Sequence, residues 1–131
     1  MNIFSFLKLY VVTLVVFLAI DFTWLGLIAK KMYDAWMSGF DRTIRWIPAM
    51  GVYLLLVLGI VLLIVPQSKG NPLSAFIFGG VFGLVSYGVY DLTNLATLTA
   101  WSPTMAIVDL AWGAVLCGTV SAVSTYLFSK L

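Results

Sequence analysis

The sequence predicts an all-α integral membrane protein, a four-helix bundle of spanning helices in a single domain over residues 1–131. Two observations support this fold class. The chain of 131 residues is 63% hydrophobic and only 9% charged, with a mean hydropathy of +1.10, whereas a soluble domain is roughly 25% charged. It also contains four apolar runs, each long enough at about 1.5 Å per helical residue to cross about 30 Å of hydrocarbon.

Turn signals bound the predicted spans. The spans cover approximately residues 5–29, 46–66, 73–96 and 104–128. Pro48 lies in the first turn of the second span, where a helix needs no N–H donor, and we expect Pro66 to end this span. The polar segment 67–72 predicts a tight turn, and residues 101–103 predict a turn at the membrane interface.

The connection between the first two spans, residues 30–45, is longer than the others and allows two predictions. Met32, Trp36 and Phe40 recur every four residues, which is typical of a short interfacial helix with its apolar face toward the bilayer. Gly39 would interrupt such a helix. An irregular loop whose aromatic residues lie in the interface explains the same pattern equally well.

Basic residues do not decide the orientation of the chain in the membrane. The side of the termini carries three basic residues, Lys8, Lys69 and Lys130. The other side carries four, Lys30, Lys31, Arg42 and Arg45. This division is too even for the positive-inside rule, although the dense charge of the first connection favours a cytoplasmic location for it. A dual-topology arrangement stays open.

Composition excludes several functional classes. A net charge of +2 with scattered Lys and Arg argues against a nucleic-acid partner. The chain has no His, so it lacks the usual general base, the commonest zinc ligand and any Ser-His or Cys-His pair. Cys117 is the only cysteine, and its apolar flanks predict an inert packing thiol. We predict no cofactor and no metal, since a site made only of Asp suits at most a hard cation.

Three aspartates, Asp21, Asp91 and Asp109, lie inside the apolar runs. An ionisable side chain at the centre of a membrane helix costs roughly 2.5–3.5 kcal/mol on insertion scales, so three of them indicate a function. Because successive spans run in opposite directions, all three fall in the half of the bilayer next to the first and third connections. We predict that they form one site as its catalytic groups, with at least one proton shared or retained among them.

The helix faces that carry these aspartates predict an acidic and aromatic pocket around them. The predicted ligand-binding residues are Tyr10, Phe17, Trp24, Tyr87, Asn94 and Trp112, together with Arg42 and Arg45, which reach inward from the interface. In that geometry the first connection would cover the mouth of the pocket. The simplest alternative is that the aspartates only hydrogen-bond across helices, at a gain of about 0.6 kcal/mol per bond.

Three short motifs resemble a known family. DFTWLG spans Asp21 to Gly26, YDLTN spans Tyr90 to Asn94, and DLAWG spans Asp109 to Gly113. With these motifs, and over nearly its whole length, the chain resembles a bacterial family of small predicted membrane proteins catalogued as a domain of unknown function. The resemblance implies a four-span, multi-pass protein of the bacterial inner (plasma) membrane and implies no particular activity.

The leading functional hypothesis is a pocket within the membrane that binds a lipid-like or isoprenoid small molecule. Asp21 or Asp109 would serve as the acid that protonates or isomerises it, and the aromatic rings would stabilise a carbocation. Whether the protein is an enzyme stays open. The expected partners are membrane lipids and this hydrophobic molecule, with a homodimer as an open option.

Two alternatives come from other functional classes. A small proton-coupled transporter, working as a dimer, would use an aspartate that alternates between a proton and a cationic substrate. A non-enzymatic assembly subunit would use the acids only as contacts between helices. In that case their loss would impair folding or association rather than a separate activity.

Overall fold

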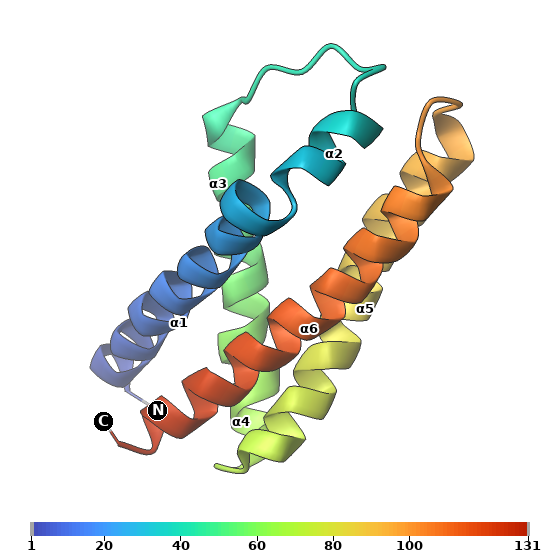
Figure 1. Cartoon of the computed structure of the whole chain (residues 1–131). Helices are drawn as coiled ribbons and strands as arrows, with labels where there is room; N and C mark the ends of the chain where they lie inside the picture. Colours follow the sequence, from blue (N-terminus) through green and yellow to red (C-terminus); the bar gives the residue numbers. More distant parts are fainter. Residues whose placement is uncertain (1, 131) are drawn as a thin grey trace.

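The computed structural model describes residues 2–130, which fold into helices and their connections (Figure 1). Within this range there are no strands, and four helical segments are long and apolar enough to cross a membrane. They cover Ile3–Ile28, Trp46–Ser68, Pro72–Thr97 and Pro103–Phe128. The predicted all-α fold with four spans is therefore confirmed. Met1 and Leu131, the two ends of the predicted domain, lie outside the described residues.

The first span begins at a capping residue and ends in a wide helical turn. The Asn2 side chain accepts a hydrogen bond from the backbone N–H of Ser5 at 2.8 Å, which satisfies a free donor of the first turn. Helix α1 (Ile3–Thr23) follows, and a π-helical turn, η1 (Trp24–Ile28), completes the span. Such turns are rare and frequently lie at functional sites.

The first connection contains a short helix, α2 (Lys30–Trp36), which begins after the buried Ala29. A turn and an irregular stretch follow over residues 37–45. The predicted interfacial helix is therefore right for its first half only, and the alternative, an irregular loop, is right for the rest. Gly39, which has a low helix propensity, lies in the turn where the helical pattern stops.

The second span consists of three consecutive segments, α3 (Trp46–Gly59), the π-helical η2 (Ile60–Ile64) and α4 (Val65–Ser68). The prediction that Pro66 ends this span is wrong by two residues. Pro66 lies in the first turn of α4, where its missing N–H leaves no hydrogen bond unmade. The helix ends instead at Lys69, which adopts a left-handed backbone with φ 52°.

The third and fourth spans are single long helices, α5 (Pro72–Thr97) and α6 (Pro103–Phe128). Each has proline near its first position and a polar cap before it. The Asn71 side chain accepts hydrogen bonds from two backbone N–H groups of α5, and the Ser102 hydroxyl accepts one from α6 at 3.2 Å. Both helix starts are therefore determined by local sequence.

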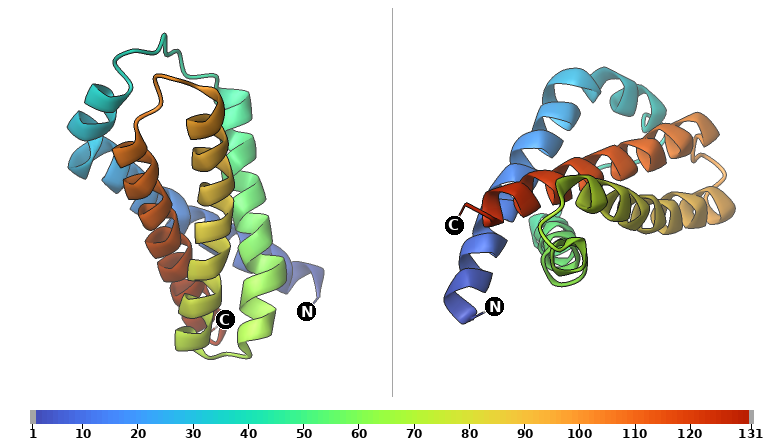
Figure 2. Two further views of the ribbon diagram at one scale, coloured as in Figure 1. Left: turned by 90° about the vertical axis from the view of Figure 1, so that its right-hand side faces the viewer. Right: turned by 90° about the horizontal axis from the view of Figure 1, so that it is seen from below.

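Helices α5 and α6 lie side by side and form the closest pair in the bundle (Figure 2). Glycines make this approach possible. A methyl group added at Gly83 would come within 2.7 Å of the Cys117 Cβ, and one added at Gly79 within 2.6 Å of the Ser121 Cβ. Small residues at such contacts let helix backbones approach closely in a membrane. The pair also carries Asp91 on α5 and Asp109 on α6.

Helix α1 packs against α6 and α3 around an apolar core. Fully buried members of this core are Leu9, Phe17, Val57, Ile60, Val61, Leu116, Cys117 and Val120. One buried polar contact crosses it, because the Thr13 hydroxyl donates a hydrogen bond to the Ser124 hydroxyl at 2.9 Å. The first and third connections lie at one end of the bundle, and both termini lie at the other (Figure 1).

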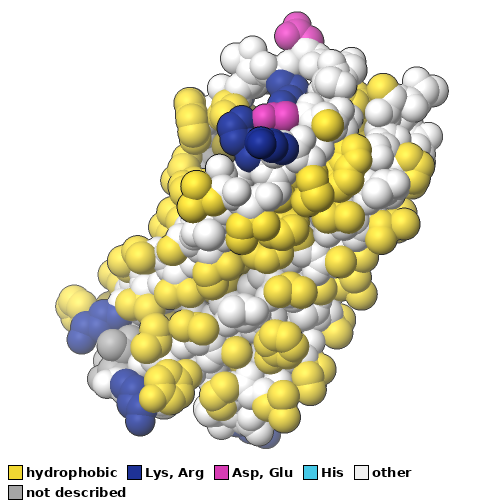
Figure 3. All heavy atoms as spheres, in the orientation of Figure 1, with side chains coloured by type: hydrophobic (Ala, Val, Ile, Leu, Met, Phe, Trp, Pro, Cys, Tyr) yellow, Lys and Arg dark blue, Asp and Glu magenta, His cyan; other side chains and the backbone are white. Residues whose placement is uncertain are grey.

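The surface around the spans is largely apolar, as Figure 3 shows for one face, with the charged side chains near the two ends. Leu27 and Ile47, for example, are 82% and 89% exposed. Large apolar side chains on the outside of a helical bundle are stable in contact with lipid chains rather than water. The protein is therefore a multi-pass membrane protein.

Candidate ligand-binding site

The three aspartates lie in the half of the bundle next to the first and third connections. Asp21 is near the end of α1, Asp91 lies in the last third of α5, and Asp109 lies in the second turn of α6. Asp91 is 1% exposed and Asp21 is 4% exposed. The predicted depth of the three side chains therefore agrees with their positions in the bundle.

Two of the three aspartates, Asp91 and Asp109, face the same cavity, of about 180 Å³, which we call the acidic cavity. Its other lining residues are Leu25, Tyr33, Met37, Arg42, Tyr90, Trp101 and Met105. Tyr33, Met37 and Arg42 all belong to the first connection. This connection therefore forms part of the wall of the cavity.

The carboxyl of Asp91 is buried without a hydrogen-bond partner. It lies against the carboxyl of Asp109 and beside the indole of Trp101. Within the described residues, neither of its oxygens has a hydrogen-bond partner, and the indole Nε1 of Trp101 has none either. A buried polar group left unsatisfied costs about 1–3 kcal/mol, so native proteins rarely keep two of them together.

The carboxyl of Asp109 is held from the first connection. It accepts a hydrogen bond from the Tyr33 hydroxyl at 2.9 Å, and this hydroxyl accepts one from the Trp24 Nε1 at 3.4 Å. Burial, reinforced by the nearby Asp109 and Asp91, raises the pKa of the Tyr33 hydroxyl above its usual value. Tyr33 therefore stays protonated and remains a hydrogen-bond donor to Asp109.

The third aspartate, Asp21, lies outside the acidic cavity and has both carboxyl oxygens occupied. One accepts a hydrogen bond from the Trp112 Nε1 at 3.0 Å and the other from the Tyr53 hydroxyl at 2.9 Å. Phe17 packs edge-on against the Tyr53 ring, with centroids 5.6 Å apart. These contacts hold Asp21 in place and satisfy one acceptor site on each of its oxygens.

A continuous series of contacts nevertheless connects Asp21 with the acidic cavity. The indoles of Trp112 and Trp24 stack with centroids 4.4 Å apart and an interplanar angle of 11°. Trp24 in turn donates to Tyr33, which donates to Asp109. The three aspartates therefore belong to one network, although only two of them share a cavity.

The other predicted ligand-binding residues are divided between this network and more distant positions. Tyr10 lies on the Asp21 face but three turns away, where its hydroxyl donates to the backbone carbonyl of Leu54 at 2.8 Å. Asn94 neighbours Tyr90 and does not line the acidic cavity. A residue that shares a helical face with an aspartate is therefore part of the site only when it also lies at the same depth in the membrane.

The arginines of the first connection do not pair with the membrane aspartates. Arg42 lines the acidic cavity, but its Nη2 forms an ion pair with Asp34 at 2.9 Å, and Lys30 pairs with the same carboxyl at 2.8 Å. These two cations hold the pKa of Asp34 below its usual value. Arg45 is exposed at the start of α3. No ion pair within the described residues involves it or a membrane aspartate.

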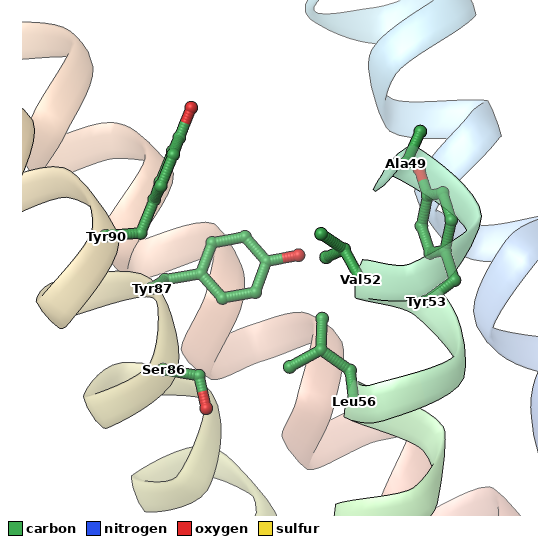
Figure 4. Close-up of a pocket in the computed structure, with 7 residues that line it drawn as sticks. All are labelled: Ala49, Val52, Tyr53, Leu56, Ser86, Tyr87 and Tyr90. Atoms are coloured by element: carbon green, nitrogen blue, oxygen red, sulfur yellow. The ribbon is translucent and has the colours of Figure 1, made fainter. Parts of the chain in front are cut away.

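A second, larger cavity of about 390 Å³ lies between α3 and α5, and we call it the apolar groove (Figure 4). Its lining residues are Ala49, Val52, Tyr53, Leu56, Ser86, Tyr87 and Tyr90. The predicted ligand-binding residue Tyr87 therefore lines the groove and not the acidic cavity. Tyr90 lines both cavities.

Sequence reasoning missed several residues of the site. Tyr33 and Tyr53 donate to aspartates from the first connection and from α3, two elements that carry no membrane aspartate. For Trp101 the sequence predicts only an interfacial turn, yet its indole lies beside Asp91. One signal for Tyr53 exists in the sequence, since a phenol within a span needs a hydrogen-bond partner at its own depth.

The comparison with known families agrees with this architecture. A family described as "Predicted membrane protein (DUF2177)" matches residues 6–126, a range that includes Asp21, Asp91 and Asp109. No curated protein and no solved structure matches the chain. The family description names no activity, so it adds nothing to the chemistry of the site. The chain, with its four apolar helices, belongs to this DUF2177 family of membrane proteins.

Proposed function

We propose that this protein, located in the bacterial inner membrane, binds the polar end of a lipid-like or isoprenoid molecule in the acidic cavity. The single observation that supports the proposal most is the pair of unsatisfied groups beside this cavity, the carboxyl of Asp91 and the indole N–H of Trp101. A ligand that satisfied both groups would recover the cost of burying them.

The chemistry of these two groups selects a hydroxyl as the polar end of the ligand. A hydroxyl can donate to the carboxyl of Asp91 and also accept from the Nε1 of Trp101. An ammonium group donates only, so it would leave the indole N–H unsatisfied. A phosphate would bring negative charge toward two carboxyls. A long-chain alcohol, alkyl or isoprenoid, therefore fits the cavity best.

The same cavity would also supply an acid. Two adjoining carboxyls in a medium of low dielectric constant are stable when one of them retains a proton, and Tyr33 stabilises the charge on Asp109 by its hydrogen bond. Asp91 would then be the proton donor. In an isomerisation, the proton would add to one carbon of a double bond, and a carboxylate would then remove a different proton from a neighbouring carbon. The double bond would move, and the composition of the ligand and the number of protons on the carboxyls would be unchanged.

Binding of tritiated dodecan-1-ol and farnesol to the purified protein in detergent tests the first part of this function. We expect saturable binding of at least one alcohol, a loss of ten-fold or more in affinity for Asp91→Leu, and wild-type affinity for Asp41→Leu, a control in the exposed first connection. Dodecylamine should bind more weakly than dodecan-1-ol. Equal affinity of the Asp91 variant and the wild type would refute the proposal.

Hydrogen exchange into farnesol tests the chemical step. In D₂O, an isomerase would introduce deuterium at carbons next to a double bond, and Asp91→Asn should abolish the incorporation while it preserves the shape of the cavity. Binding without any exchange would restrict the function to ligand binding and exclude the acid role of Asp91.

A proton-coupled carrier is the second candidate, favoured by the adjoining carboxyls of Asp91 and Asp109. Entry of a hydrophobic cation would displace the proton retained by one of the carboxyls, which is the coupling that an exchanger needs. Reconstituted vesicles with an internal pH dye and external tetraphenylphosphonium would report such exchange. An Asp91-dependent pH change would favour transport, whereas its absence would leave alcohol binding as the function.

A further inference from the structure

We infer that the apolar groove between α3 and α5 holds the hydrocarbon chain of the same alcohol, which enters the protein sideways from the bilayer. This inference rests on the proposed function, because the acidic cavity would bind the hydroxyl end. It goes further by assigning a second site, a route of entry and a class of ligand with one long chain.

The groove opens toward lipid because α3 and α5 separate in the half of the bundle that holds the aspartates. Toward the other half they touch, where the Phe82 ring packs against Gly59, and α5 also contacts η2 and α4. Two residues of the groove, Val52 and Tyr90, are each 55% exposed on the surface that faces the bilayer. A lipid chain can therefore reach the groove without crossing water.

The lining of the groove suits a hydrocarbon chain. No charged side chain lines it. Of its hydroxyls, that of Tyr53 is bonded to Asp21 and that of Ser86 to the backbone carbonyl of Phe82. The hydroxyl of Tyr87 has no hydrogen-bond partner among the described residues, and its ring extends across the groove toward Val52 (Figure 4). The hydroxyl of Tyr90, the fourth in the lining, has no hydrogen bond to a described residue either. A few polar groups in an otherwise apolar site are typical of small-molecule pockets.

Tyr90 connects the two cavities. It lines both of them, and its ring lies edge-on against Trp101 with centroids 5.7 Å apart. Trp101 is the residue whose indole N–H would bind the hydroxyl of the ligand. A molecule with its hydroxyl at Asp91 would therefore pass Tyr90 and extend its chain into the groove.

The extent of the groove suits a single hydrocarbon chain. From Ala49 to Leu56 the groove follows about 10 Å of α3, at about 1.5 Å per residue. Tyr90 lines both the groove and the acidic cavity. This continuity favours the chain of a molecule that also occupies the acidic cavity over a second protein helix, which would lie in the groove alone.

Photo-crosslinking with dodecan-1-ol and farnesol analogues that carry a diazirine at the end of the chain tests this inference. We expect mass spectrometry to locate the crosslinks on residues 49–56 of α3 and 86–90 of α5. Val52→Trp would fill the groove and should lower the crosslink yield there at least ten-fold. Leu55→Trp is the matched control, because Leu55 is 69% exposed on the same helix and does not line the groove.

The readouts separate failure of this inference from failure of the proposed function. If the yield depends on Asp91 but the crosslinks lie on α1 or α6, the hydroxyl site stands and the groove assignment is wrong. If Asp91→Leu leaves the yield unchanged, the proposed function is wrong. A wild-type dimer in detergent that Val52→Trp converts to a monomer, as measured by light scattering, would show that a second copy occupies the groove and would overturn the inference. The two analogues distinguish an alkyl from an isoprenoid chain.

Discussion

Tyr33 and Asp109 are 76 positions apart in the sequence, and their side chains form a hydrogen bond of 2.9 Å over the acidic cavity. The bond attaches α2 to the first turns of α6. Around it, part of the first connection packs against a buried cluster of Trp101, Met105 and Ala106. The packed residues are Tyr33, Trp36, Met37 and Phe40. The short helix is therefore part of the site and covers it, in addition to connecting two spans.

Removal of the Tyr33 hydroxyl should loosen this cover. Tyr33→Phe deletes the donor to Asp109 and the acceptor of Trp24, so we expect a loss of about 0.5–1.5 kcal/mol per bond and faster hydrogen exchange in α2. Hydrogen-exchange mass spectrometry in detergent measures the effect. Tyr126→Phe is the control, because the Tyr126 hydroxyl is exposed and bonds to no described residue. Equal exchange in the two variants would mean that the bond does not hold α2.

The two most buried aspartates should differ in their effects on stability. Asp21→Leu leaves the Trp112 indole and the Tyr53 hydroxyl without acceptors, at a cost of about 1–3 kcal/mol each. Asp91→Leu removes an unsatisfied carboxyl that adjoins Asp109, so the melting temperature should be unchanged or higher. Thermal unfolding in detergent measures both. A large destabilisation by Asp91→Leu would instead assign Asp91 a structural role, as the assembly-subunit hypothesis requires.

Ion pairing of Asp34 should appear in its titration. Hydrogen bonds from Lys30 and Arg42 lower its pKa below the reference value of 3.8. Because the folded-state pKa is depressed, the stabilisation is complete above the unfolded-state value and is lost as the pH falls through the folded-state value. Carboxyl carbon NMR should give a midpoint below 3.8 in the wild type and a higher one in Arg42→Gln. Identical midpoints would show that the ion pair does not persist in solution.

Close packing of α5 against α6 should make Gly83 intolerant of a side chain. A Cβ there would meet the Cβ of Cys117 at 2.7 Å, so Gly83→Ala should destabilise the protein by about 1–3 kcal/mol. At Gly51 nothing lies within 4 Å of an added Cβ, and Gly51→Ala should stabilise α3 by about 0.5–1 kcal/mol. Thermal unfolding distinguishes the two. Similar melting temperatures would indicate that α5 and α6 are further apart than described.

Asp91 follows Gly83 by two helical turns, so the same substitution should also affect the site. If the Gly83 variant separates the helices, Asp91 and Asp109 move apart and alcohol binding should weaken. Gly51→Ala should leave binding unchanged. Retained binding in a destabilised Gly83 variant would show that the two carboxyls do not need their present spacing.

The sequence by itself determined the four spans and the depth of the three aspartates. Insertion of a helix into a membrane depends on the summed hydropathy of about 20 consecutive residues, which is a local property that can be read without knowledge of the neighbours. Alternation of span direction then places Asp21, Asp91 and Asp109 in one half of the bilayer. Polar caps such as Asn71 and Ser102 are local signals as well.

Tertiary structure alone decided which groups meet within that half. The rotation of each helix about its axis depends on packing with distant segments, such as Gly83 against α6, and hydropathy contains little information about it. Packing therefore separated Asp21, enclosed by Trp112 and Tyr53, from the facing pair of Asp91 and Asp109. It also brought Tyr33 over the cavity, because a short helix at the interface is stable only where the bundle offers it a surface to pack on.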